Sequence, residues 1–401
     1  MGSREFVNEF PEYKGEKLLE TDGTLEKGYK QRLLAEVERQ LNRLTTGLQD
    51  TDDRDYSVYT GITGIAYLHY HLWNVVDGRQ STSHLHAALQ HTERALRHLK
   101  GRKLSFLCGD AGPLALGAVL YEHAGKRDKS RDCVKRLVSL HKDVCRDPEI
   151  PDEILFGRAG YLFALLFVQR NIDHSEIDTV VIERVIKAII DSGRSLSSEE
   201  RSPCPLMYAW HGKQYLGAAH GMVGIFYILM QVTSPDIRHY LEEFLRPSID
   251  YLMTLQFPSG NYPSSIGSAT GDKLIHWCHG APGWIHMFIL AYKVFNDKKY
   301  MSAAKSCSEV IWQRGLLRKG YGICHGVAGN AYGFLALYQA TQDVKHLHRA
   351  IKFAEWCFDY GKHGCRTPDR PLSLFEGLAG TIYFLADLTN PQKAKFPAFQ
   401  L

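Results

Sequence analysis

The stretch HGVAGNAYGFLAL at residues 325–337 decides the fold, because the chain repeats its pattern seven times. In each copy, two glycines three residues apart open a strongly apolar run. The first glycines of the seven copies are Gly61, Gly109, Gly157, Gly221, Gly280, Gly326 and Gly377. Their spacings are 48, 48, 64, 59, 46 and 51 residues. A near-regular period of roughly this length is typical of a repeat architecture.

Amphipathic segments with helical period lie between these runs. Lys30–Leu48 places Leu33, Val37, Leu41 and Leu44 on one face, with charged residues opposite. The same pattern recurs in His84–Leu99, Arg131–Val144, Ile182–Leu196, Ile237–Leu255, Tyr300–Ile311 and Leu347–Phe358. Strand-like alternation is scarce. One inner apolar helix and one outer amphipathic helix per repeat predict an all-α fold, a double-layered (α/α)7 barrel, or toroid, of seven helical hairpins.

The paired glycines of each G-x-x-G turn need a structural explanation. Glycine adopts positive φ without steric cost, and it allows backbones to approach closely. We therefore expect a turn with positive φ at the first glycine, and a helix start packed tightly on its neighbours at the second.

Composition limits the class of protein. The 401 residues carry 48 basic and 44 acidic side chains, a net charge of +4 that gives no sign of nucleic-acid binding. The longest apolar run, Tyr161–Val168, is too short for a transmembrane segment. Nine dispersed cysteines suit a reducing compartment. We expect one barrel domain over residues 1–401, with residues 1–30 as an N-terminal extension, in the cytoplasm; peripheral membrane association stays open.

Polar residues gather at equivalent positions of the later repeats. The residues just before the first glycines are Thr60, Cys108, Phe156, His220, His279, His325 and Glu376. The residues one position earlier are Tyr59, Leu107, Leu155, Ala219, Cys278, Cys324 and Phe375. Symmetry places both columns at the N-termini of the inner helices, around one mouth of the barrel. Cys, His and Glu in repeats four to seven therefore predict a functional site there.

Cys278, Cys324 and His325 form a candidate metal site. Two thiolates and one imidazole suit zinc, and three protein ligands leave the open position of a catalytic zinc. His279 is a competing ligand, because it occupies the same column as His325. The alternative is two structural cysteines with two helix-capping histidines.

Other polar residues near this rim suggest further roles. His220 has no adjacent cysteine, so it suits a general acid or base, or an orienting group; the alternative is a helix-terminal histidine satisfied by backbone. Lys319 and Arg366 lie in the polar stretches RKGYG (318–322) and HGCRTPD (363–369). They could bind carboxylates of an acidic ligand, or the second stretch is simply a loop.

The motifs FLCGDAGPLA, GAAHG, HWCHGAPG, KGYGICHG, HGCRTPD and LFEGLAGTIYFLADL make the chain resemble the eukaryotic lanthionine synthetase C-like family over essentially its whole length. The resemblance implies a seven-fold double ring of helices with one zinc ion held by Cys278, Cys324 and His325. It implies glutathione as ligand, with its thiol on zinc and its peptide near Lys319, Arg366, Thr367, Pro368 and Asp369. It also implies thiol addition to dehydroalanine or dehydrobutyrine in proteins, and a glutathione S-transferase activity.

Departures from the bacterial lanthionine cyclases bear on the reaction. Those enzymes carry tyrosine where this chain has His279 and arginine where it has Leu274, and Glu153 stands in place of their aspartate. His220 matches their histidine. The departures argue against ring closure in a lantibiotic and leave intermolecular addition open. A metal-bound thiol is deprotonated, and the enolate formed by addition needs a proton that His220 or His279 could deliver.

Two other classes of protein compete with this transferase. The first is a non-catalytic zinc- and glutathione-binding signalling adaptor, since the resemblance also implies SH3-domain partners. The prolines are few and unclustered, which offers little for SH3 recognition. The second is an (α/α)-barrel glycosidase, which needs two carboxylates across a cleft where this rim supplies cysteines and histidines.

Overall fold

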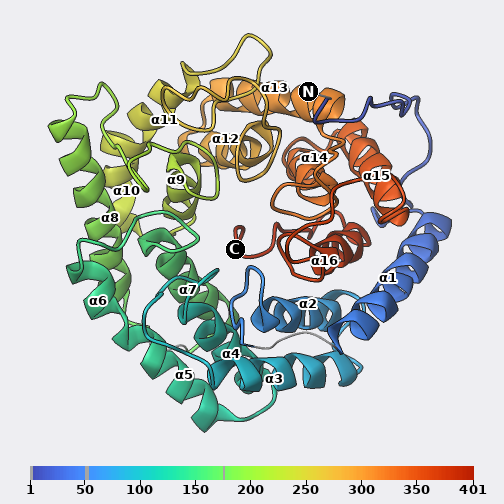
Figure 1. Cartoon of the computed structure of the whole chain (residues 1–401), viewed down its shortest axis with the longest axis horizontal. Coiled ribbons are helices and arrows are strands. Elements are labelled where there is room, and N and C mark those ends of the chain that lie inside the picture. Colours follow the sequence, from blue (N-terminus) through green and yellow to red (C-terminus); the bar gives the residue numbers. More distant parts are fainter. Residues whose placement is uncertain (1–2, 50–53, 175–176) are drawn as a thin grey trace.

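Seven apolar helices stand around a common axis and form the inner ring (Figure 1). The computed structural model describes residues 3–49, 54–174 and 177–401. The inner helices are α2 (Ile62–Val75), α4 (Ala111–His123), α7 (Arg158–Asn171), α9 (Met222–Met230), α12 (Ala281–Phe295), α14 (Val327–Thr341) and α16 (Leu378–Leu388). Each packs on the next, and α16 packs on α2, which closes the ring.

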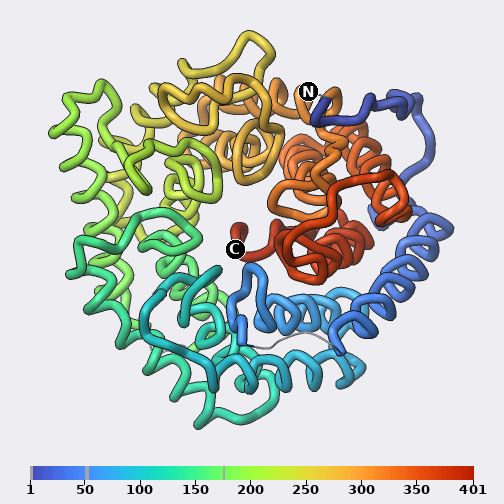
Figure 2. Tube along the Cα trace, viewed as in Figure 1, coloured from blue at the N-terminus to red at the C-terminus, as the bar shows by residue number. Residues whose placement is uncertain are grey.

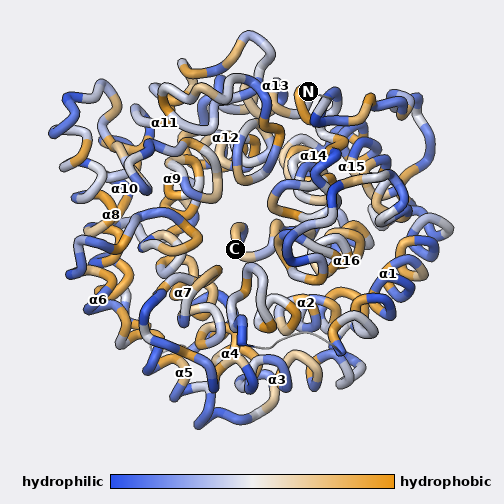
Figure 3. Tube along the Cα trace, in the orientation of Figure 1, coloured by the Kyte–Doolittle hydropathy of each residue, from blue (hydrophilic) through white to orange (hydrophobic). Residues whose placement is uncertain are grey.

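Amphipathic helices form the outer layer. They are α1 (Lys27–Leu48), α3 (Ser83–Leu96), α5 (Arg127–Ser139), α6 (His141–Arg146), α8 (Thr179–Glu199), α11 (Arg246–Met253), α13 (Lys298–Arg314) and α15 (Val344–Phe358). Figure 3 shows the inner helices as mainly apolar and the outer ones as mixed. Among the described residues there are isolated β-bridges and no named strand. The predicted all-α double-layered (α/α)7 barrel is therefore confirmed.

The connections between helices place the long loops at one mouth. Each turn from an inner helix to the following outer helix is short; Asn296 and Gln342, both left-handed at φ 51° and 58°, end α12 and α14 and reverse the chain at once. The loops that lead back to an inner helix are longer, for example residues 254–280 before α12 (Figure 2). Because these loops all end at inner-helix N-termini, they surround the mouth where the polar columns were predicted.

The helix pairing closes the outer ring. The inner helix of each pair comes first in the sequence, since α2 packs chiefly on α3, α4 on α5, and α12 on α13. The first outer helix, α1, packs instead on the last inner helix, α16. The first and last helices of the array therefore pack against each other, as Figure 1 shows.

Two predicted outer helices are interrupted. The segment expected over Ile237–Leu255 is divided into a 3-10 turn, η1 (Pro235–Ile237), a short helix, α10 (Arg238–Tyr240), a π-helical turn, η2 (Leu241–Leu245), and α11. Pro247 explains the π turn, because it lacks the N–H that a regular helix needs. The segment expected over Arg131–Val144 is likewise divided into α5 and α6 at Leu140.

Close packing of the backbone explains the glycine pairs better than a requirement for positive φ does. Five of the first glycines have φ between −135° and −101°, so the expected positive φ is wrong for them. Gly280, at φ 106°, is the exception. The expected tight packing is confirmed: a Cβ on Gly329 would lie 1.8 Å from the carbonyl oxygen of Ile323. The second glycine therefore lets the inner helix start directly against its preceding turn.

Gly329→Ala is accordingly expected to lower the free energy of unfolding by about 1–3 kcal/mol, the usual cost of overpacking. Gly28→Ala is the matched control, because Gly28 lies in the exposed first turn of α1 and a Cβ there meets only the flexible Glu26 side chain. The control should be neutral or slightly stabilising. Urea denaturation measures both, and equal stability of the two variants would contradict the packing argument.

The N-terminal segment is fastened to the outer layer. The Phe6 ring lies 5.2 Å from that of Trp356, and Asn8 Nδ2 donates to Trp312 O at 2.7 Å. The backbone N–H of Arg318 donates to Arg4 O at 3.0 Å, so the segment also reaches the loop before α14. It therefore contributes to the barrel and leads directly into α1.

The C-terminal segment lies on the axis of the ring (Figure 1). Phe396 and Phe399 pack against Trp277, with ring centroids 4.8 and 5.2 Å away. Trp277 is fully buried and precedes Cys278. The end of the chain therefore supports one wall of the polar mouth. None of the helices in the described part of the chain combines the length and apolar character that a bilayer crossing requires.

Candidate functional site

Backbone hydrogen bonds join equivalent residues of neighbouring repeats around the mouth. Cys278 N–H donates to Cys324 O at 3.2 Å, and Cys324 N–H donates to Phe375 O at 2.8 Å. Phe375 N–H donates to Tyr59 O at 3.1 Å, and Tyr59 N–H donates to Leu107 O at 3.0 Å. The predicted column is thus an observed arc of adjacent turns, and it brings residues far apart in sequence side by side.

Cys278, Cys324 and His325 converge on this arc. Their ligand atoms all lie within 4.8 Å of one another, with both cysteines buried and the histidine partly exposed. Cys278 ends the loop before α12, while Cys324 and His325 end the loop before α14. The backbone hydrogen bond between the two turns holds the two cysteines next to each other.

The chemistry of this group fits zinc. Two sulfur atoms and one imidazole nitrogen are the donors that zinc prefers, and three ligands leave one position for a further molecule. Burial, together with the hydrogen bond from Cys278, raises the pKa of the Cys324 thiol well above its usual range. A neighbouring cation is what would allow such a thiol to ionise. Tyr59 donates its hydroxyl to Cys324 Sγ at 2.9 Å, a contact suited to an electron-rich sulfur.

Two further histidines border the group without joining it. His279 lies beside Tyr215, with ring centroids 5.9 Å apart, and its buried Nδ1 has no hydrogen-bond partner among the described residues. Burial and the nearby His276 lower the pKa of His279 to about 4. His276 places Nδ1 4.0 Å from Cys278 Sγ. The convergent set therefore contains His325, and His279 lies next to it.

His220 faces the same mouth and is held by a buried carboxylate. Its Nδ1 lies 2.9 Å from Glu153 Oε2, and the Glu153 side chain is only 2% exposed. Glu153 also accepts backbone N–H bonds from Leu155 at 2.9 Å and from Phe156 at 2.6 Å. Three donors thus surround this carboxylate, which orients the imidazole. Nε2 is then the His220 atom left for a reacting group.

The two polar loops predicted at the rim lie side by side. Arg366 N–H donates to Arg318 O at 2.8 Å, which joins the loop before α14 to the loop before α16. Lys319 is exposed, and its positive charge lowers the pKa of His279, so it lies near the metal group. Arg366 pairs with Asp369 at 3.1 Å. Thr367 is exposed and Pro368 half-buried in the same loop.

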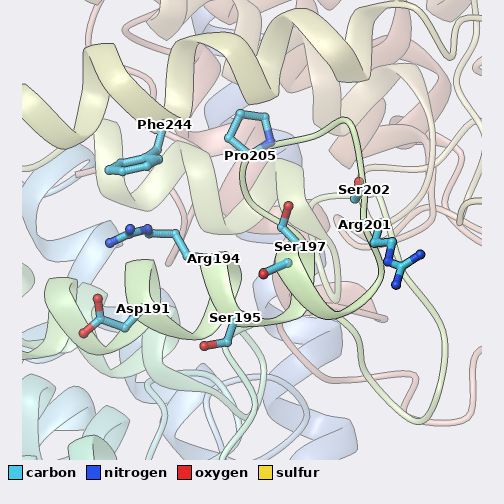
Figure 4. Close-up of a pocket in the computed structure, with 9 residues that line it drawn as sticks. Asp191, Arg194, Ser195, Ser197, Arg201, Ser202, Pro205 and Phe244 are labelled. Carbon is cyan, nitrogen blue, oxygen red and sulfur yellow. The ribbon is translucent and has the colours of Figure 1, made fainter.

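Other hollows lie away from this arc. One of about 740 Å³ is lined by Arg194 and Ser197 of the C-terminal part of α8 and by Arg201, which follows that helix (Figure 4). Another, of about 820 Å³, lies among the C-terminal ends of α2, α7 and α16, and so at the opposite mouth. Neither contains any of the predicted site residues.

Several residues of the mouth were not predicted. The hydroxyl of Tyr59 and the ring of Tyr215 were missed, as were His276 and Trp210. Tyr59 stands in the same column as the two cysteines, so the repeat alignment contained the information to find it. Trp210 and Tyr215 lie in the loop before α9, which has no counterpart of similar sequence in the other repeats.

Comparison with known proteins identifies the class. The family model described as lanthionine synthetase C-like protein matches residues 52–401. The chain is 47% identical over 405 residues to "Glutathione S-transferase LANCL1" of Danio rerio, covering 99% of each chain. The solved structure of nisin cyclase resembles it with a TM-score of 0.65 and 16% identity, covering 91% of this chain and 95% of the cyclase.

The fold and the mouth thus define an all-helical toroid with a candidate Cys2His metal centre. The chain belongs to the lanthionine synthetase C-like family, as the resemblance in motifs such as HWCHGAPG and KGYGICHG predicted. The likeness to nisin cyclase independently supports the toroidal fold.

Proposed function

We propose that this protein is a zinc-dependent transferase that adds the thiol of glutathione to dehydroalanine or dehydrobutyrine residues of proteins. The observation that carries the proposal is the convergence of Cys278, Cys324 and His325 within 4.8 Å at a mouth that also holds the His220–Glu153 pair. The name of the zebrafish relative supports glutathione as the thiol. The proposed reaction is an intermolecular addition and not lantibiotic ring closure.

Cys278, Cys324 and His325 would hold one zinc ion per chain. When bound there, zinc would lower the pKa of a glutathione thiol, so that the thiol is ionised at neutral pH. The two cysteine thiolates leave little net positive charge on such a centre, which keeps a bound sulfur nucleophilic. The two cysteine residues themselves are only 7% and 3% exposed.

Lys319 and the loop from Arg366 to Asp369 would hold glutathione by its charged ends. Glutathione carries two carboxylates and one ammonium group, and this part of the rim offers Lys319 and Arg366 as cations and Asp369 as an anion. The charges of the rim therefore equal those of glutathione in number and are opposite to them in sign. Thr367 and Pro368 would line the same side of the peptide.

His220 would supply the proton. In the addition, the glutathione sulfur forms a bond to the β-carbon of the dehydroamino acid, and the π electrons of the C=C bond move toward the adjacent carbonyl. The α-carbon then takes a proton, which His220 Nε2 can give while Glu153 holds Nδ1. His279 is the second candidate donor, although its buried Nδ1 has no hydrogen-bond partner among the described residues.

The chemistry of the cysteines supports a cytoplasmic location for this reaction. All nine are free thiols. Such a set is typical of proteins in a reducing compartment, where glutathione is also abundant in its thiol form.

Lys319→Ala and Arg366→Ala are each expected to weaken glutathione binding by about 1.5–3 kcal/mol, which is the range for a hydrogen bond to a charged group. Isothermal titration calorimetry measures the change, and metal content should stay the same. Lys362→Ala is the matched control, because Lys362 is an exposed cation of the neighbouring segment that pairs with Asp359. Unchanged affinity in both test variants would make the Arg366–Asp369 segment an ordinary loop.

The proposal is tested by incubating a dehydroalanine peptide with glutathione and the purified protein. Mass spectrometry should find a thioether at the former dehydroalanine, at a yield well above that of glutathione alone. Glutathione binding is measured on the same sample. A protein that binds glutathione and yields no additional thioether is a binding module, and the transferase assignment is then wrong.

A further inference from the structure

A cavity of about 680 Å³ opens beside His220 and has no part in the steps described so far. Its walls come from the loops before α4, α7 and α9, and its volume falls in the usual range for ligand pockets. The lining residues that matter below are Arg102, Lys103, Phe156, Trp210, Tyr215 and His220. We call it the His220 groove.

Aromatic rings lead from this groove to the proposed proton donor. The Phe156 ring lies parallel to the His220 imidazole, with centroids 6.2 Å apart and planes at 8°. Trp210 continues the series at 6.0 Å from Phe156 and 27°. All three side chains are half-buried, so part of each ring faces solvent. This arrangement offers an apolar surface that begins at the reacting atom and extends outward.

A tight turn holds Trp210 in place. Trp210 and Lys213 exchange backbone hydrogen bonds of 2.9 and 3.1 Å. The two residues between them, His211 and Gly212, both have positive φ, at 49° and 69°. Positive φ at both central positions is the pattern of a type I′ turn, and it is unfavourable for a histidine. The turn that holds Trp210 at this place therefore carries local backbone strain at His211.

The charged side chains of the groove favour neither an anionic nor a cationic ligand. Lys103 Nζ lies 5.0 Å from the centre of the Phe156 ring, and Arg102 is next to it. Asp147 and Glu149 also line this groove. Two cations and two carboxylates leave no net charge, so the rings are the feature that can discriminate between ligands.

The position of the groove relative to the metal group suits a second substrate. Around the inner ring the order of helices is α4, α7, α9, α12, α14 and α16 (Figure 1). The groove belongs to the loops before α4, α7 and α9, while the cations proposed to bind glutathione belong to the loops before α14 and α16. The metal group, before α12 and α14, lies between them. A thiol and an electrophile bound in these places would approach each other from opposite sides.

We infer that the His220 groove binds the polypeptide that carries the electrophilic residue, and that Phe156 and Trp210 select an aromatic or large apolar side chain next to that residue. The inference rests on the addition reaction proposed above, and it makes an extended peptide the preferred class of electrophile. A small electrophile would react at the mouth without using the groove. Trp210 is then a specificity-determining residue.

Trp210→Ala tests the inference with two dehydroalanine peptides that carry phenylalanine or glycine beside the reactive residue, and with a small dehydroalanine ester. The variant should raise KM for the phenylalanine peptide by about fivefold to tenfold, the effect expected of a lost aromatic contact. Its kinetics with the glycine peptide and the ester, its KM for glutathione and its metal content should match the wild type. Trp210→Phe should keep the preference. Lys213→Ala alters the same turn outside the groove lining and is the matched control.

A binding measurement separates this inference from the proposed reaction. An unreactive peptide with alanine in place of dehydroalanine is titrated with the protein and followed by fluorescence anisotropy. Trp210-dependent binding without turnover of the dehydroalanine peptide would support the groove and overturn the reaction. Normal turnover with equal KM for the phenylalanine and glycine peptides, or with no effect of Trp210→Ala, would overturn the groove and leave the reaction intact.

Discussion

Cys324→Ala is expected to reduce the metal content of the purified protein from one ion per chain to less than about a tenth of that, because a three-ligand site that loses a thiolate keeps too few donors to retain zinc. The Cys324 sulfur lies within 4.8 Å of the Cys278 sulfur and accepts the Tyr59 hydroxyl at 2.9 Å. Elemental analysis after dialysis gives the metal content. Glutathione addition should fall to the rate of the reaction without protein.

Matched variants decide which residues hold the metal. Cys307→Ala removes an equally buried thiol on α13, outside the convergent group, and should keep the full metal content. His325→Ala should lose metal and His279→Ala should keep it. The reverse result for the two histidines would reassign the third ligand. Full metal retention in Cys324→Ala would remove that residue from the set.

His220→Ala is expected to lower kcat for the dehydroalanine peptide by about 10²–10⁴-fold, the usual contribution of a positioned general acid or base. Metal content and glutathione affinity should not change, because the imidazole pairs with Glu153 and does not belong to the metal group. Steady-state kinetics with saturating glutathione measures the effect.

Two variants accompany His220→Ala. Glu153→Gln should lower kcat, because an amide holds the imidazole less strongly than a carboxylate does. His239→Ala, on the exposed α10, controls for the loss of a histidine elsewhere and should leave kcat unchanged. A nearly wild-type kcat in His220→Ala would assign proton delivery to His279 or to solvent. Loss of metal in that variant would show that His220 is a ligand.

The architecture was predictable because its information is local and repeated. Each G-x-x-G pair and the apolar run behind it, as in residues 325–337, marks one inner helix, and seven hairpins in a ring can bury the faces that a single hairpin leaves exposed. The backbone conformation of those turns was harder to predict from the sequence. Positive φ was expected at every first glycine and occurs among the turns discussed only at Gly280. Close approach of a carbonyl also excludes a side chain, as at Gly61, where a Cβ would lie 2.0 Å from Asp55 O.

The candidate site was predictable to the extent that it follows the repeat. The two columns before the first glycines brought Cys324, His325 and His220 to one mouth, and the structure places them there. The repeat pattern could not predict contacts that depend on the shape of the loops. Tyr59 reaches Cys324 across 265 residues only because the ring closes. Trp210 depends on a strained turn within a loop that no other repeat shares.

The turnover number for glutathione addition tests the central claim most directly. A dehydroalanine peptide is incubated with glutathione and zinc-loaded protein, and the initial rate of thioether formation is compared with that of glutathione alone and of the Cys324→Ala variant. The predicted result is multiple turnovers per protein chain, at a rate that falls to the uncatalysed rate in the variant. An initial rate for the wild-type protein equal to that of glutathione alone, with metal and glutathione both bound, would contradict the account.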